Sequence, residues 1–562
     1  MPTPSPGAVA ALSPRRRLAV LLTLCLAAFT INLDTTIVNV TLPTLVRDLD
    51  ASTRQLQWIV DSYNLVFAAL VLAAGSVSDR LGRRGALLVG LGIFAVGSLL
   101  GSRAGSPGQL IAVRGLIGLG AAVIFPATLS ILTNVFTERS ERAKAIGLWG
   151  AMTGVGVAAG PISGGWLLEH FWWGSVFAAV VPVAAVVAAL TVLWVPSSRD
   201  PNTPRLDLLG LALSTAVIGT LVFTIIEAPE VGWLTGRTLA SFAIVAGLLA
   251  VFVRWERHVA QPMLDVELFR NLRFTAASGS VTIAFFALFG FIFMVTQYFQ
   301  FLKGYSPFST GLRLLPVALS VGAASILGTK LAVRLGNKAV VSAGLASMGI
   351  AFLWISTAST ATQYFELAGQ MIVLGIGMGL TSAPATEAIM GVVPKEKAGI
   401  GSAVNDATRE LGGTLGVAVI GSVFASLYAA RLALPRGLPS EAAHAARESV
   451  GGAFIAAQRV ADAGLGPAAT QLRDAASLAF FDGFAVGCLV AAGVALLGAL
   501  AAAILLPAHP LVDTTESVDP TQTSNWRPSR RLPDPARWDQ DTRSRAPNHP
   551  APRRPTSGRS TS

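Results

Sequence analysis

Charged side chains are scarce in this sequence. They make up 13% of the 562 residues, whereas a water-soluble domain carries about a quarter because its surface must face water. Hydrophobic residues make up 52%, and the mean hydropathy is +0.61. This composition excludes an ordinary soluble protein and predicts a chain whose surface largely faces lipid.

Groups that could bind a metal or perform catalysis are also few. The two cysteines, Cys25 and Cys488, each lie in an apolar run, so we expect buried thiols rather than a disulfide. The five histidines are scattered without metal-ligand spacing. The sequence has no Gly-x-x-x-x-Gly-Lys-Ser/Thr motif, which excludes ATP hydrolysis at a P-loop in this chain. We therefore predict neither an enzyme nor a bound cofactor.

Apolar stretches long enough to cross a bilayer, roughly 20 residues each, are in contrast abundant. They predict an all-α polytopic membrane protein with fourteen transmembrane helices. The predicted spans are residues 18–41, 56–75, 86–102, 109–133, 143–167, 171–195, 206–226, 238–255, 275–301, 311–332, 339–357, 363–390, 399–428 and 478–506.

These spans divide the chain into two six-helix halves with two helices inserted between them. The tail is rich in Pro, Arg, Ser and Thr, cannot bury enough apolar surface to fold, and is predicted to be disordered. The sequence leaves open whether the long outer loop folds. The predicted parts are the cytoplasmic N-terminal segment 1–17, the first half 18–195, the inserted helices with their cytoplasmic loops 196–274, the second half 275–507 with its outer loop 431–477, and the cytoplasmic tail 508–562.

The excess of positive charge, +11 in total, falls mainly in loops that this topology places inside. Basic residues in cytoplasmic loops orient membrane helices and contact anionic lipid head groups. The pattern predicts a multi-pass protein of the inner (plasma) membrane, with both termini cytoplasmic and membrane lipids as partners. No basic patch with interleaved aromatics lies outside the spans, so we expect no nucleic-acid binding.

A short motif occurs once in each half. Residues 75–84 read Gly-Ser-Val-Ser-Asp-Arg-Leu-Gly-Arg-Arg, and residues 333–338 read Val-Arg-Leu-Gly-Asn-Lys. The two copies follow the second and tenth spans, which are equivalent if each half has six helices. Internal duplication of this kind is typical of secondary transporters, whose substrate path runs between the halves.

Three charged residues are predicted inside spans of the first half. Asp34, Asp61 and Arg114 lie roughly 8–12 Å inside the outer ends of spans one, two and four, at 1.5 Å per residue. A charge in the bilayer costs several kcal/mol unless it is paired, so such residues are rarely there for packing. We predict a proton site with Asp34 as the main coupling carboxylate, Arg114 as its partner and Asp61 as an auxiliary group. The alternative for Asp34 is a polar helix-end residue satisfied by a neighbour.

Small residues recur along span five, at Gly154, Gly160, Pro161, Gly164 and Gly165. Small residues at every fourth position let helices touch, and a proline permits a kink. Generic helix packing explains the spacing, and a hinge between conformations is the functional alternative.

Span thirteen carries Asp406, Arg409 and Glu410 on one helix face, because they are three and four positions apart. One interpretation is a local Asp–Arg pair that keeps the helix neutral. The other is an anionic contribution to a cavity for cationic drugs. Weaker candidates for the substrate path are Asn32, Gln297, Tyr298 and Gln300.

Together these motifs resemble the major facilitator superfamily, and more closely its fourteen-helix drug:proton antiporter branch, the EmrB/QacA-type exporters. The resemblance covers roughly residues 18–507. It implies that the Gly-Pro-x-x-Gly-Gly ending in span five marks an exporter. Two features depart from the pattern: Ile117 stands where the family often has glutamine, and Asp406 and Glu410 stand where many members have amides. The resemblance also implies that the 75–84 loop switches between conformations, through Gly75, Asp79, Arg80, Gly82, Arg83 and Arg84.

The resemblance implies a function as well. We expect alternating-access export of lipophilic, cationic drugs or toxic small molecules in exchange for protons, by a monomer driven by the proton gradient. One alternative is a dedicated exporter of a single antibiotic or metabolite. The other is a membrane receptor or scaffold without transport, which the short inner loops disfavour.

Overall fold

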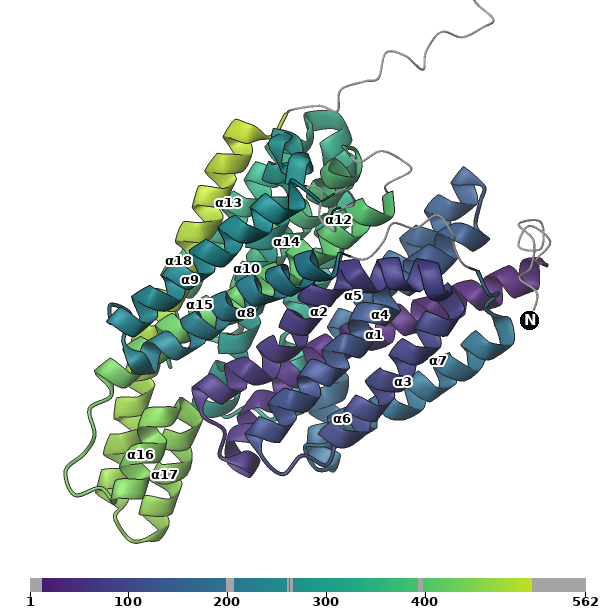
Figure 1. The fold of residues 1–562 in the computed structure, drawn as a ribbon. Coiled ribbons are helices and arrows are strands. Elements are labelled where there is room, and N and C mark those ends of the chain that lie inside the picture. The colour runs from purple at the N-terminus through teal and green to yellow at the C-terminus, as the bar shows by residue number, and fades with distance from the viewer. Residues whose placement is uncertain (1–12, 199–206, 260–261, 263–265, 393–397, 508–562) are drawn as a thin grey trace, which may run out of the picture. The chain divides into compact units, whose positions relative to one another are not determined.

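A computed structural model describes residues 13–198, 207–259, 262, 266–392 and 398–507, and every regular element in those ranges is helical (Figure 1). The chain divides into Met1–Pro510, which holds all of these helices, and Leu511–Ser562. The predicted tail at 508–562 and residues 1–12 of the predicted N-terminal segment lie outside the described residues. The prediction of an all-α protein is confirmed.

The helices form two sets separated by an inserted pair. The inserted pair is α8 (Leu208–Val231) and α9 (Gly236–Glu256). The first half contains α1 (Pro14–Leu49), α2 (Thr53–Leu81), α3 (Arg83–Gly101), α4 (Pro107–Val135), α5 (Arg139–His170), α6 (Ser175–Ala178) and α7 (Val180–Trp194). The second half contains η2 (Val266–Arg270), α10 (Leu272–Gln297), η3 (Tyr298–Leu302), α11 (Pro307–Arg313), α12 (Leu315–Leu335), α13 (Asn337–Ile355), α14 (Tyr364–Met390), α15 (Ala398–Arg431), α16 (Ser440–Glu448), α17 (Val450–Asp462) and α18 (Gly466–Leu505).

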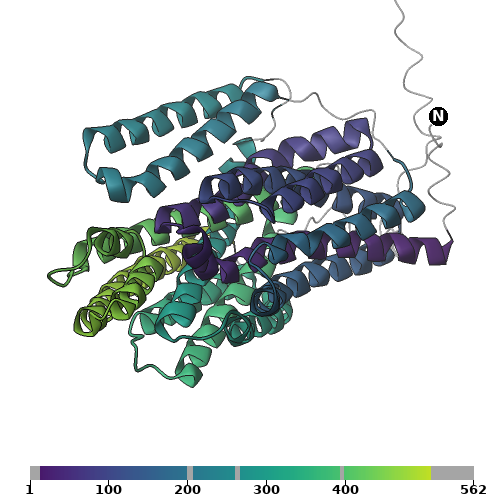
Figure 2. The same cartoon turned by 90° about the horizontal axis from the view of Figure 1, so that it is seen from below.

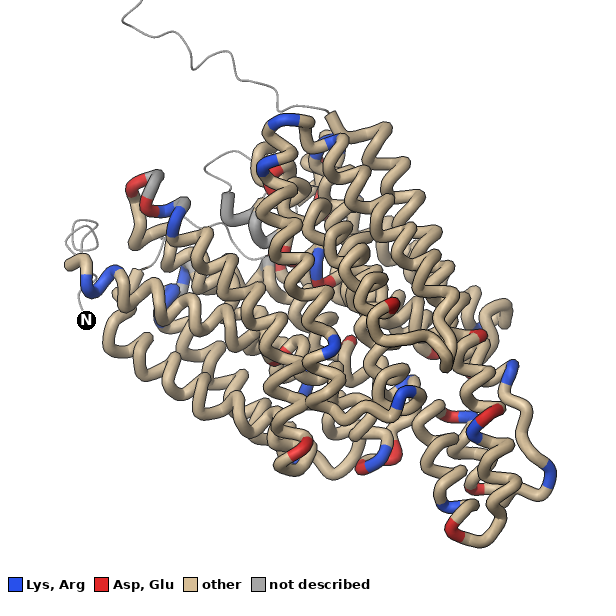
Figure 3. Tube along the Cα trace, turned by 180° about the vertical axis from the view of Figure 1, so that it is seen from behind, with Lys and Arg blue, Asp and Glu red and all other residues tan. Residues whose placement is uncertain are grey.

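Thirteen segments of the described helices are long and apolar enough to cross a membrane. The remaining predicted span is α2, whose 29 residues include the charged Arg54, Asp61 and Arg80 and which packs among the others. Lys, Arg, Asp and Glu gather toward the two ends of the helices, and the stretches between are nearly free of charge (Figure 3). This distribution is the one that a multi-pass membrane protein requires, because charges are costly in the bilayer core.

The two halves repeat one packing pattern. In the first half α1 packs on α5, α2 and α3 pack on α4, and α3 packs on α7; in the second half α10 packs on α15, α12 and α13 pack on α14, and α13 packs on α18. The duplicated Arg-Leu-Gly motif has the same backbone role in both. Gly82 ends α2 with φ 120°, and Gly336 ends α12 with φ 83°. Both values are strained for residues with a side chain, which explains glycine at both positions.

Local sequence explains where many helices begin. Ser52 accepts a hydrogen bond from the Gln55 backbone N–H while the Gln55 side chain accepts one from the Ser52 N–H, which together form a capping box at α2. Ser13 and Ser106 cap α1 and α4, each followed by proline in the first turn. Within the spans, threonine hydroxyls such as those of Thr23 and Thr30 donate to carbonyls one turn earlier, which satisfies them without water.

Two features differ from the sequence predictions or answer an open question. The first helix continues through Pro43 to Leu49, beyond the predicted end at residue 41, so Asp34 lies farther from the end of its helix than expected.

The loop at 431–477 is folded: α16, α17 and the start of α18 surround a small core of alanines with Val460 and Leu472. We call the α16–α17 pair the hairpin, and the end of the bundle that carries it the hairpin end (Figure 1).

Candidate functional site

The centre of the candidate site is a buried ion pair between α1 and α4. Nη1 of Arg114 donates to Oδ2 of Asp34 over 2.7 Å, and the two side chains are 1% and 0% exposed. The sequence prediction that Arg114 has a carboxylate partner is confirmed. Oδ1 of Asp34 is buried without a hydrogen-bond partner among the described residues. The carboxylate therefore has one oxygen held by Arg114 and one free to accept a proton.

Helix α2 holds Arg114 in place from the other side. Nε of Arg114 donates to the Ile59 carbonyl at 3.1 Å, and its guanidinium lies 4.3 Å from the centre of the Tyr63 ring. The Tyr63 and Thr35 hydroxyls are hydrogen-bonded at 3.2 Å. Gly118, one turn after Arg114, permits this approach, because a Cβ there would lie 2.5 Å from the Tyr63 carbonyl oxygen. Gly118 thus lets α2 and α4 come close enough for Arg114 to bind α2.

Asp61 is buried but lies outside this ion pair. Its side chain is 0% exposed, and neither carboxylate oxygen has a hydrogen-bond partner among the described residues. The sequence analysis grouped Asp61 with Asp34 and Arg114 in one layer. The structure joins only the latter two, and Asp61 remains a spare buried carboxylate on α2.

The sequence analysis missed a polar side chain that joins the halves. Gln57, one turn before Asp61 on α2, donates from Nε2 to the carbonyls of Val417 and Ala418 on α15 at 3.2 and 3.1 Å. Gln57, Asp61 and Asn64 are all at most 1% exposed and follow each other at helical spacing on one face. That spacing was a signal visible in the sequence. Gln57 therefore joins the first half to α15, and Asp61 and Asn64 lie on the same face of α2 as Gln57.

On α15, Asp406, Arg409 and Glu410 share a face as predicted. Arg409 lies 3.8 Å from Asp406 and places its guanidinium 4.7 Å from the Phe285 ring centre. The local Asp–Arg pair is thus present but loose. Oε2 of Glu410 is buried without a hydrogen-bond partner in the described chain. The second half therefore has a buried carboxylate oxygen of its own, on α15.

The glycine motif of α5 makes close helix contacts on two sides. A Cβ at Gly160 would collide with Thr36 and with the backbone of Leu33 and Ile37 on α1, and one at Gly164 would collide with Ile37. Toward the second half, a Cβ at Gly165 would lie 2.5 Å from the Cα of Phe308. Across the same contact, a Cβ at Gly311 would collide with the carbonyl of Pro161. The motif is therefore a contact of α5 with α1 and with α11, whereas Gly154 faces open space.

This difference within the motif gives a matched pair of variants. We expect Gly160→Ala to lower both the thermal stability and the transport rate, because overpacking of this kind costs about 1–3 kcal/mol. Gly154→Ala should change neither, since its added methyl meets nothing within 4 Å. Thermal unfolding of the two purified variants and dye efflux measure the effects. Equal behaviour of the pair would show that the contact on α1 is not critical.

The 75–84 segment contacts the end of α7. It is not the loop that the sequence predicts, because α2 continues beyond residue 75 to Leu81 and α3 begins at Arg83, with Gly82 between them. The Arg83 N–H donates to the Ser198 carbonyl at 2.9 Å, and Nη2 of Arg84 donates to the Val192 carbonyl at 2.7 Å. Gly75 packs on Pro126 of α4, and Arg80 is exposed. The Asp79 side chain lies outside the described part of the structure. The start of α3 is thus bound to the last turn of α7 and to the residues that follow it.

The four weaker candidates for the substrate path lie in different surroundings. Gln300 donates to the Val40 carbonyl at 2.8 Å and so joins η3 to α1 across the halves. Asn32 donates to Ala28 in its own helix and faces α5 near Gly156. Gln297 also donates within its own helix, to the Phe293 carbonyl. The Tyr298 hydroxyl donates to Ser359 inside an aromatic cluster of the second half.

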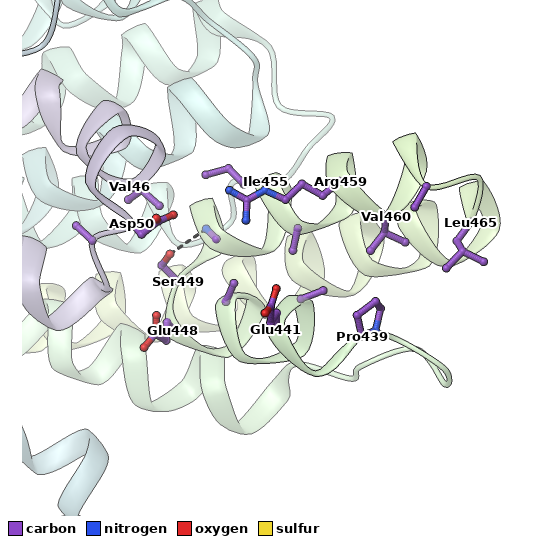
Figure 4. Close-up of a pocket in the computed structure, with 16 residues that line it drawn as sticks. Val46, Asp50, Pro439, Glu441, Glu448, Ser449, Ile455, Arg459, Val460 and Leu465 are labelled. Carbon is purple, nitrogen blue, oxygen red and sulfur yellow. Dashed lines mark hydrogen bonds between the residues drawn. The ribbon is translucent and has the colours of Figure 1, made fainter.

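Contacts between the halves gather at the hairpin end. Besides the bonds of Gln57 and Gln300, Thr53 donates to the Glu448 carbonyl at 3.0 Å, and Phe308 donates its backbone N–H to Glu169 at 3.3 Å. A cavity of about 220 Å³ opens between the α1–α2 corner and the hairpin, with Asp50 and Val46 on one side and Glu441 and Arg459 on the other (Figure 4). At this end, therefore, the two halves are held together.

Known proteins similar to this chain fall in one class. The sequence matches the Major Facilitator Superfamily over residues 24–417. It is 37% identical to the multidrug efflux pump LfrA of Mycolicibacterium smegmatis, covering 87% of this chain and 96% of the relative. It is 34% identical to the methyl viologen resistance protein SmvA of Salmonella typhimurium, covering 78% and 88%.

A solved structure has the same fold. The crystal structure of a bacterial homolog to the human lysosomal transporter Spinster, in an inward-facing and occupied conformation, aligns with a TM-score of 0.63. The alignment covers 88% of this chain and 98% of that chain at 16% sequence identity, so the likeness concerns the fold alone. The predicted major facilitator fold is confirmed. With its repeated halves, its multi-pass helices and its matched sequence, this chain belongs to the Major Facilitator Superfamily of membrane transporters.

Proposed function

We propose that this protein is a proton-coupled antiporter that exports lipophilic, cationic compounds across the inner membrane by alternating access. It would belong to the fourteen-helix drug:proton antiporter branch and act as a monomer. The observation that carries the proposal is the buried Asp34–Arg114 pair inside a transporter fold, in which one carboxylate oxygen has no hydrogen-bond partner among the residues that the structure describes. Relatives named for multidrug efflux and for resistance to methyl viologen, an organic dication, support cationic substrates.

The geometry of the pair supports a proton-exchange role. Arg114 has anchors other than Asp34, namely the Ile59 carbonyl and the Tyr63 ring, so it stays in place when the carboxylate is neutralised. Protonation of Asp34 would remove the charge that binds α1 to Arg114 of α4. Loss of the proton would restore the pair. The protonation state of Asp34 would thus decide how firmly α1 is held, and α1 in turn packs on the glycine motif of α5.

Two further carboxylates support a cation site near the contact between α2 and α15, which we call the seam. Glu410 on α15 and Asp61 on α2 each have buried carboxylate oxygens without hydrogen-bond partners in the described chain. An unpaired carboxylate in an apolar environment is costly, and a bound cation would remove that cost. A lipophilic cation between the halves would therefore compete with protons for these groups. Such competition is the basis of exchange.

The topology follows from the charge pattern. With both termini cytoplasmic, the hairpin end would be the outer end, and the halves are joined there by Gln57 and Gln300. The 75–84 segment would lie on the cytoplasmic side, where its contact with the end of α7 would change as the halves rock. The structure would then represent a state closed to the outside.

Dye transport in inside-out membrane vesicles tests the proposal. Vesicles containing the protein should accumulate ethidium, a fluorescent lipophilic cation, when respiration establishes a proton gradient. A protonophore should release the accumulated dye. Accumulation that persists with the protonophore present would contradict proton coupling. Export of one antibiotic with no transport across a panel of dyes would favour the dedicated exporter instead.

The Glu410→Gln variant tests the cation site separately. We expect it to reduce ethidium transport by about tenfold, a loss of about 1.4 kcal/mol, because it removes a buried negative charge from the seam. Transport of an uncharged lipophilic substrate should fall much less. Glu441→Gln, on the exposed hairpin, is the matched control and should transport both compounds at the parental rate. Equal losses for charged and neutral compounds would indicate a structural role for Glu410.

A further inference from the structure

The inserted helix α8 lies across the seam between the halves. It packs on α2 of the first half and on α15 of the second, while α9 packs on α8. Figure 2 shows the α8–α9 pair as a separate layer beside the bundle. Because α2 and α15 contact each other where the halves are joined, α8 bridges a contact that must open if the hairpin end is to open.

Toward α2, α8 makes two ion pairs and an aromatic contact. Nη1 of Arg54, in the first turn of α2, lies 3.0 Å from Glu227 and 2.8 Å from Glu230 near the end of α8. The Trp58 and Phe223 rings add a contact at 6.2 Å between centroids. Arg54 is 37% exposed and Glu230 is 56% exposed, so these pairs are individually weak and separable.

Toward α15, α8 is held by close apolar packing. Val222 and Ile226 of α8 form a small buried cluster with Ala418 of α15, and these three side chains are at most 1% exposed. Just beyond α8, Nε1 of Trp233 donates to Oγ of Ser426 at 3.1 Å. None of the five residues named in this contact is charged. The α15 side of α8 is therefore the firmer attachment.

We propose that α8 is a strap that keeps the α2–α15 seam closed at the hairpin end. During opening it stays with α15 and releases α2 by breaking the Arg54 ion pairs. The strap packs on the segment of α15 whose carbonyls Gln57 binds. The α8 contact and the Gln57 hydrogen bonds therefore hold the same part of the seam closed. The inference rests on the proposed function only in that this end opens during transport.

A buried reporter cysteine tests the strap in the full-length purified protein. The chain has two native cysteines, so Cys25→Ala and Cys488→Ala provide a cysteine-free background. Val417→Cys then places one thiol at the seam, where the native side chain is 0% exposed. We expect Arg54→Gln to raise the rate of maleimide labelling at this position by roughly two- to tenfold, because two partly exposed ion pairs are lost. Arg237→Gln, exposed at the start of α9, should leave the rate unchanged.

A charge swap separates the ion pairs from other effects of the substitution. Arg54→Glu alone should label faster than Arg54→Gln, because three carboxylates then repel. Adding Glu227→Arg and Glu230→Arg should restore the slow parental rate. Equal labelling of the parent and Arg54→Gln would overturn the proposal, as would a swap that fails to restore slow labelling.

Labelling of a second buried cysteine, Cys488, distinguishes unfolding of the variant from opening of the seam. In a chain whose sole cysteine is Cys488, which is fully buried in α18, Arg54→Gln should leave labelling as slow as in the parent. Fast labelling of Cys488 would mean that the variant unfolds, and this would overturn the strap interpretation. The labelling needs no proton gradient and no substrate. Its failure is therefore distinguishable from failure of ethidium transport in vesicles.

Discussion

Replacing Asp34 by Asn is expected to abolish proton-driven efflux while the protein remains folded. The amide oxygen can still accept a hydrogen bond from Arg114, but the side chain cannot take up and release a proton. The initial rate of ethidium accumulation in energised inside-out vesicles should fall about tenfold or more, which corresponds to at least about 1.4 kcal/mol in the rate-limiting barrier. Ethidium binding to the purified variant should persist, because the carboxylates of the seam are unchanged.

Asp48 provides the matched control for this experiment. It lies on the same helix as Asp34, near the end of α1, and its side chain is exposed. Asp48→Asn removes the same charge with the same substitution and should transport at the parental rate. If Asp34→Asn also transports at the parental rate, the coupling carboxylate must lie elsewhere, and the spare buried Asp61 becomes the next residue to test.

Replacing Arg114 by Gln is expected to destabilise the protein strongly. Asp34 is fully buried, so removing its cationic partner leaves a carboxylate without compensation in an apolar environment. Breaking a buried pair in this way costs about 3–5 kcal/mol. Thermal unfolding of the detergent-purified protein should begin at a clearly lower temperature, and the yield of monodisperse protein should fall.

The double variant distinguishes stability from coupling. Asp34→Asn with Arg114→Gln leaves no uncompensated charge, so it should recover most of the stability lost in Arg114→Gln and still lack proton-driven efflux. Arg103→Gln, exposed in the turn before α4, is the control for losing one arginine and should behave as the parent. An Arg114→Gln protein that unfolds at the parental temperature would contradict the stabilising role of the pair.

The halves share one packing pattern but differ in chemistry. The first half carries the Asp34–Arg114 pair between α1 and α4. In the second half the charged residues at the seam lie on α15, where Glu410 has a buried oxygen without a partner in the described chain. In the proposed mechanism the first half therefore senses the proton and the second contributes to cation binding.

Residue types and their spacing were enough to predict some contacts of the site. Arg114 in an apolar span required a carboxylate partner because an unpaired charge there is too costly, and the structure supplies Asp34. The glycines of span five indicated close helix contacts, and Gly160 and Gly164 make them with α1. The spacing of Gln57, Asp61 and Asn64 marked a polar face of α2. The Val417 carbonyl that Gln57 binds lies 360 positions away, and no pattern near Gln57 in the sequence predicts this contact.

The sequence by itself determined the class of fold, because each apolar run long enough to cross a bilayer must satisfy its own backbone hydrogen bonds as a helix. It also determined that membrane charges needed partners. Only the tertiary structure decided where partners are present: Asp34, 80 positions away, pairs with Arg114, whereas Asp61 has no hydrogen-bond partner among the described residues. It likewise decided that the 431–477 segment folds and that α8 bridges both halves. These outcomes depend on contacts between helices distant in sequence, which spacing along a single helix does not encode.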